Sequence, residues 1–100
     1  MTRGGVQASE GHDRAVLTLN DIAMNAVTDA ITAVVAPSKL GLIVVVGEPV
    51  ALEMYTDKFA AIVLAIEGGQ AAGTAFAKIV TGAANPSGAL PFTMFVCDVP

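Results

Sequence analysis

Apolar residues fall into four long segments whose spacing distinguishes helices from strands. Over residues 21–36, apolar side chains recur three and four positions apart, which predicts an amphipathic helix that ends before the next proline. Residues 40–47 (LGLIVVVG) and 60–66 (AAIVLAI) are continuous apolar runs between turn residues, a pattern typical of strands buried on both faces. Residues 70–81 return to helical spacing and predict a second helix that ends near Gly82.

Shorter segments complete an α/β pattern. Residues 15–19 are β-prone, residues 50–55 predict a helical turn, and residues 92–96 predict a last strand. Strands that alternate with helices imply right-handed crossovers, so we predict a small parallel-sheet αβα sandwich of the α/β class. The two continuous apolar runs should lie parallel and adjacent at the centre of its sheet, with the two helices covering the faces. Residues 1–9 are expected to be a flexible leader and residues 10–100 a single domain.

Composition narrows the choice of partners. Hydrophobic residues make up 54% of the 100 residues and charged residues 14%, against about a quarter in typical domains. The net charge is −4 and the five basic residues are scattered, which argues against a nucleic-acid or membrane-surface partner. Charges interrupt the apolar runs too often for a membrane span, and the first residues lack the apolar centre of a secretory signal. The high apolar content instead predicts dimers or larger assemblies, formed through a sheet edge or helix faces.

Candidates for metal, redox or nucleotide chemistry are weak. Cys97 has no second cysteine to pair with, and His12 has no neighbouring histidine or cysteine with which to bind a metal. The interval from Gly68 to Gly73 matches that of a phosphate-binding loop, but the lysine of that loop is absent. Tight packing of a helix start against the sheet explains these glycines better. Nucleotide binding is kept as the weaker alternative.

Three motifs resemble family 3 glycoside hydrolases, the β-glucosidase and β-xylosidase group. The segment EGGQAAGTAFAKIVTGAANPSGALPFT closely resembles the family pattern P-G-Q-x-G-G-x-A-x-A-x-x-L-x-G-x-x-N-P-S-G-x-L-P-x-T. Upstream, LIVVVGEPVALEM is similar to the family's strand and G-x-P-V turn, and EGHDRAVLTL is similar to its E-G-x-D-R-x-x-L-x-L motif. The resemblance covers about residues 9–96 and implies the later part of the second, C-terminal α/β sandwich domain. Departures from the family pattern occur at Glu67, Gly68, Ala72 and Ala89.

The resemblance also implies roles for three residues. Retaining glycosidases use two carboxyl groups about 5–5.5 Å apart, one as nucleophile and one as acid/base. In the family a barrel domain, which has no counterpart in these residues, supplies the nucleophilic aspartate. Glu10 matches the acid/base position, and Asp13 and Arg14 either shape its loop as an ion pair or touch sugar hydroxyls.

The function so implied is that of a fragment of a retaining β-glycosidase that acts on a β-linked sugar without a cofactor or metal. On its own the chain should be inactive or very weak, because one carboxylate cannot perform the double displacement. Two alternatives to this interpretation remain open. Glu10 can be an ordinary surface glutamate, and the chain can be a non-catalytic α/β module that associates with itself. The aromatic residues fit a core better than a sugar-stacking platform; they are Tyr55, Phe59, Phe76, Phe92 and Phe95.

Overall fold

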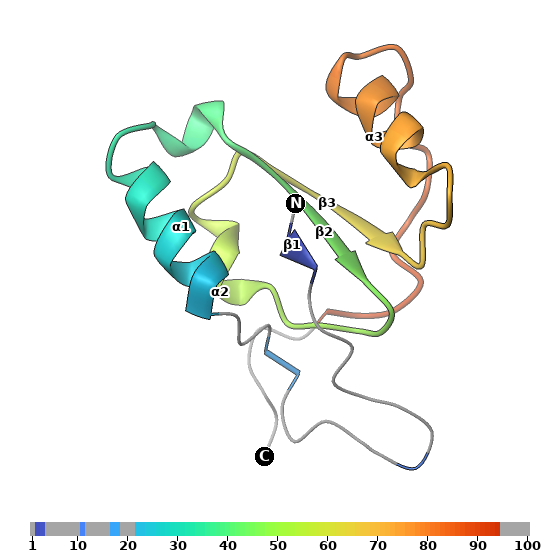
Figure 1. The fold of residues 1–100 in the computed structure, drawn as a ribbon, viewed down its shortest axis with the longest axis horizontal. Coiled ribbons are helices and arrows are strands. Elements are labelled where there is room, and N and C mark those ends of the chain that lie inside the picture. The colour runs from blue at the N-terminus through green and yellow to red at the C-terminus, as the bar shows by residue number, and fades with distance from the viewer. Residues whose placement is uncertain (1, 4–10, 12–16, 19–21, 95–100) are drawn as a thin grey trace.

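A computed structural model describes residues 2–3, 11, 17–18 and 22–94 of the chain. Figure 1 shows helices on two sides of a small sheet, which confirms the predicted α/β class. The elements follow in the order β1 (Thr2–Arg3), α1 (Ile22–Thr32), a 3₁₀ turn (Pro37–Lys39), β2 (Gly41–Val46), α2 (Glu53–Thr56), β3 (Ala61–Ile66) and α3 (Ala72–Val80).

The sheet has the order β1-β2-β3, and all its strands run parallel. Leu42 lies beside Ile62 and Val46 beside Ile66, so β2 and β3 pair along their whole length. This confirms that the two continuous apolar runs are parallel and adjacent. Their predicted place at the centre holds for β2 alone, because β1 flanks β2 and leaves β3 at the edge. β1 itself comes from the stretch predicted as a leader.

The core lies on one face of β2. Every second residue of β2, namely Leu42, Val44 and Val46, points to this face and is buried, as the two-residue period of a strand requires. α1 and α2 lie on this side of the β2–β3 pair. α1 contributes Met24, and Tyr55 of α2 is fully buried, with a hydroxyl group that donates a 2.7 Å hydrogen bond to Asn25 Oδ1. Phe59 packs against this cluster, so the prediction of core aromatics is confirmed for Tyr55 and Phe59.

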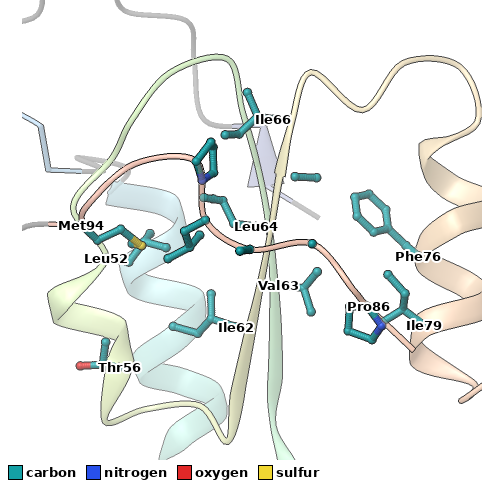
Figure 2. Close-up of a pocket in the computed structure, with 15 residues that line it drawn as sticks. Leu52, Thr56, Ile62, Val63, Leu64, Ile66, Phe76, Ile79, Pro86 and Met94 are labelled. Atoms are coloured by element: carbon teal, nitrogen blue, oxygen red, sulfur yellow. The ribbon is translucent and has the colours of Figure 1, made fainter. Parts of the chain in front are cut away.

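The opposite face is only partly covered, and the prediction that both strands are buried on both faces is wrong. Ile43 and Val45 are half-buried, and none of the six residues of β3 is buried. α3 lies on this side (Figure 1), but it too has no buried residue. Phe76 and Ile79 direct half-buried side chains toward β3 (Figure 2), which leaves the apolar strand accessible on its outer side.

Element ends follow local backbone chemistry. α1 ends at Thr32, four residues before the predicted end, and Ala36 is extended at φ −61° and ψ 138° because the following proline disfavours helical geometry. α3 ends as predicted, with Gly82 in the left-handed region at φ 74° and Thr81 at the cap. The predicted strand over residues 92–96 is absent at 92–94, and its last two residues lie outside the described residues.

Candidate functional site

The three residues predicted to carry chemistry, Glu10, Asp13 and Arg14, lie outside the described residues, as do His12 and Cys97, for which no role was predicted. One residue within their motif, Gly11, is described. It is exposed and has φ 80°, a conformation that glycine adopts without strain.

The end of the same motif is anchored to the sheet domain. The Ala51 N–H donates a 2.8 Å hydrogen bond to the carbonyl oxygen of Leu17, and Thr18 forms a parallel β-bridge with Ala51. Ala51 is buried, as are its neighbours Val50 and Leu52. Leu17 and Thr18, a few residues after Glu10 in the sequence, are thus attached to a buried part of the fold.

The three sequence motifs meet at this attachment. A small hollow of about 30 Å³ is lined by residues from all three, although the motifs are far apart in the sequence. The lining residues are Leu17 from the first motif, Pro49, Val50 and Ala51 from the second, Phe92 and Thr93 from the third, and Met94 directly after it. The structure therefore gives the three motifs a common location.

This location adjoins the edge of the sheet at which β2 and β3 end (Figure 1). Glu48 follows β2 and is half-buried, and Glu67 follows β3 with a positive φ of 46°. A Cβ atom placed on Gly47 would lie 3.6 Å from Glu67 Oε1, so the Glu67 side chain folds back over the end of β2. Parallel sheets bind ligands outside the carboxyl ends of their strands, which makes this edge the candidate functional site.

Sequence reasoning did not single out the two glutamates at this edge. Glu48 lies within the G-x-P-V turn motif without a role of its own, and Glu67 is only a departure from the family pattern. The sequence does contain a signal of a tight turn at Glu67, because two glycines follow it. Its left-handed backbone was not predictable, since glutamate seldom adopts it.

Of the two glycines before α3, Gly68 serves packing, whereas Gly69 adopts a positive φ of 63°. A Cβ atom on Gly68 would lie 2.9 Å from the Cβ of Ala72, which is too close for any larger residue. Gly73 lies inside α3 with open space around it, so the close contact belongs to Gly68 and not to Gly73. The packing interpretation therefore has structural support at Gly68.

Metal and membrane sites were also sought in the described part of the chain. Within those residues, no group of three or more histidine, cysteine, aspartate or glutamate side chains is placed to hold a metal ion. No helix there is long and apolar enough to cross a membrane.

Comparison with known proteins identifies one family. The family model described as glycosyl hydrolase family 3 C-terminal domain matches residues 2–97, nearly the whole chain. No curated protein and no solved structure gave a significant match. The family match includes all three motifs that meet at the candidate site.

Proposed function

Since this chain belongs to the family of glycosyl hydrolase family 3 C-terminal domains, we propose that it supplies the acid/base carboxyl group of a retaining β-glycosidase of the β-glucosidase type. The observation that carries the proposal is the segment EGHDRAVLTL, which lies within the matched residues 2–97 and resembles the family's E-G-x-D-R-x-x-L-x-L motif, with Glu10 at its first glutamate. The substrate class is a β-linked sugar held between this domain and a barrel domain that provides the nucleophile.

Glu10 performs two proton transfers in this mechanism. In the first step its carboxyl group donates a proton to the glycosidic oxygen while the barrel aspartate attacks the anomeric carbon. In the second step the Glu10 carboxylate takes a proton from the water that releases the sugar from the aspartate. Asp13 and Arg14 hold the loop in position or contact sugar hydroxyl groups.

Two described features support a loop that reaches out of the domain. Gly11 is exposed and left-handed, a conformation that glycine adopts without strain. The hydrogen bond between Leu17 and Ala51 fixes the end of the same motif to a buried part of the fold. An exposed glycine next to Glu10 and an anchor point a few residues later suit a carboxyl group that must approach a substrate in a neighbouring domain.

The test is hydrolysis of chromogenic β-glucosides and β-xylosides by the chain alone and by the chain fused behind the barrel domain of a family 3 enzyme. The chain alone should show little or no activity, because the nucleophile is missing, and the fusion should hydrolyse the substrate of the enzyme that provides the barrel domain. Glu10→Gln in the fusion should lower the rate by about 10²–10⁴-fold, the usual contribution of a general acid/base.

The matched control is Glu53→Gln, which makes the same change of charge at an exposed residue in the first turn of α2. This variant should keep the activity of the parent fusion. A rate that survives Glu10→Gln, or an equal loss in Glu53→Gln, would contradict the assignment of Glu10.

A further inference from the structure

β3 is an apolar strand with one unpaired side. It pairs with β2 along Ala61–Ile66, and no described residue pairs with its other side. Its six residues are all apolar, yet none is buried, and Ile66 is 38% exposed. Protected edge strands usually carry a lysine, a proline, a bulge or an inward charge, and this strand has no such residue.

An apolar groove of about 720 Å³ runs along this free side (Figure 2). Leu52, Ile62 and Met94 line it on the core side of the strand, and Phe76 and Ile79 of α3 line it on the other. Thr56 is the only polar side chain among the lining residues, and none of them is charged. Such a lining favours an apolar polypeptide surface over a sugar or an anion.

The segment 86–94 crosses the groove from α3 to the core side (Figure 2) without closing it. Residues 86–91 are exposed and form no strand, and no backbone hydrogen bond in the described part of the chain joins them to β3. The outward N–H and C=O groups of β3 can therefore pair with another strand, provided that the segment 86–94 moves aside.

The accessible surface of the whole chain is larger than that of a typical monomer of its mass. The accessible surface is 7013 Å², whereas a folded monomer of 10.1 kDa typically exposes about 5,300 Å². The excess of about 1,700 Å² is more than the roughly 800 Å² that each partner contributes to a standard interface.

We propose that the free edge of β3, with the groove beside it, binds the same edge of a second copy of this chain. A two-fold axis between the copies pairs the two β3 strands antiparallel and joins their sheets into one. The uncharged sequence AIVLAI suits this self-pairing, because every residue of β3 then faces another apolar residue and no like charges oppose each other within the paired strands.

The experiment is sedimentation equilibrium of the wild-type chain and of Val63→Lys over a range of micromolar concentrations. Val63 lines the groove in the middle of β3, and a lysine there places a charge in the apolar junction. Val34→Lys is the matched control, because Val34 is 82% exposed beyond the end of α1 and lies away from the groove. Circular dichroism of each variant reports whether it is folded.

We expect the wild type and Val34→Lys to form dimers, and Val63→Lys to raise the dimer dissociation constant by at least about tenfold. If Val63→Lys does not fold, Ile66→Lys at the exposed end of β3 provides the same test. A folded wild-type monomer throughout the concentration range would overturn the proposal. So would dimers that persist in the folded β3 variants, or that Val34→Lys disrupts equally.

Discussion

Thr28 lies in α1 with 2% of its surface exposed, and its hydroxyl oxygen has no hydrogen-bond partner among the described residues. Valine has nearly the same shape and helix propensity but no hydroxyl group. Burying a hydroxyl without a partner costs about 1–3 kcal/mol, so Thr28→Val should raise the free energy of unfolding by about 1–2 kcal/mol. In a domain of this size that gain corresponds to roughly 5–10 °C in Tm.

The assay is urea and thermal unfolding followed by circular dichroism, at one protein concentration so that association does not differ between samples. Thr32→Val is the control one turn along the same helix. The Thr32 hydroxyl group donates a 2.8 Å hydrogen bond to the carbonyl oxygen of Thr28, so this variant should lose about 0.5–1 kcal/mol. If Thr28→Val is no more stable than the wild type, the hydroxyl group has a partner and the reasoning is refuted.

Two further predictions concern packing and hydrogen bonds. Tyr55→Phe removes the 2.7 Å hydrogen bond to Asn25 Oδ1 and should lower the free energy of unfolding, measured in urea, by about 1–2 kcal/mol. Gly68→Ala brings a Cβ atom to 2.9 Å from that of Ala72 and should cost about 1–3 kcal/mol in the same assay. Gly73 lies inside α3 with open space around it, so Gly73→Ala should instead raise the free energy of unfolding by about 1 kcal/mol. Equal effects of the two substitutions would contradict the packing interpretation.

The secondary structure was largely predictable because its causes are local. The continuous apolar runs became β2 and β3, and a glycine able to adopt a positive φ ended α3 near the expected residue. The burial of β3 was not predictable, because an apolar run shows which side chains avoid water without showing what covers them. β3 lies at the edge, and α3 covers its outer face only in part.

The candidate site was predictable by resemblance more than by physical chemistry. Glu10 stands in a glycine-containing polar loop, which many surface glutamates share, and only the family motif distinguishes it. The convergence of the three motifs near Ala51 needed the structure, because no local sequence signal shows that Leu17 and Phe92 line the same hollow. Glu67 was missed for a similar reason, since its orientation over Gly47 depends on the pairing of β2 with β3.

The most direct test of the acid/base role of Glu10 is azide rescue of Glu10→Ala in the barrel fusion. An activated dinitrophenyl β-glucoside needs no proton from the enzyme to form the covalent intermediate, and azide can then attack that intermediate without a general base. The proposed role predicts slow turnover without azide, faster turnover with it, and a β-glucosyl azide product of retained configuration. Turnover of Glu10→Ala at the parent rate, or a slow variant that azide neither accelerates nor converts to glucosyl azide, would contradict it.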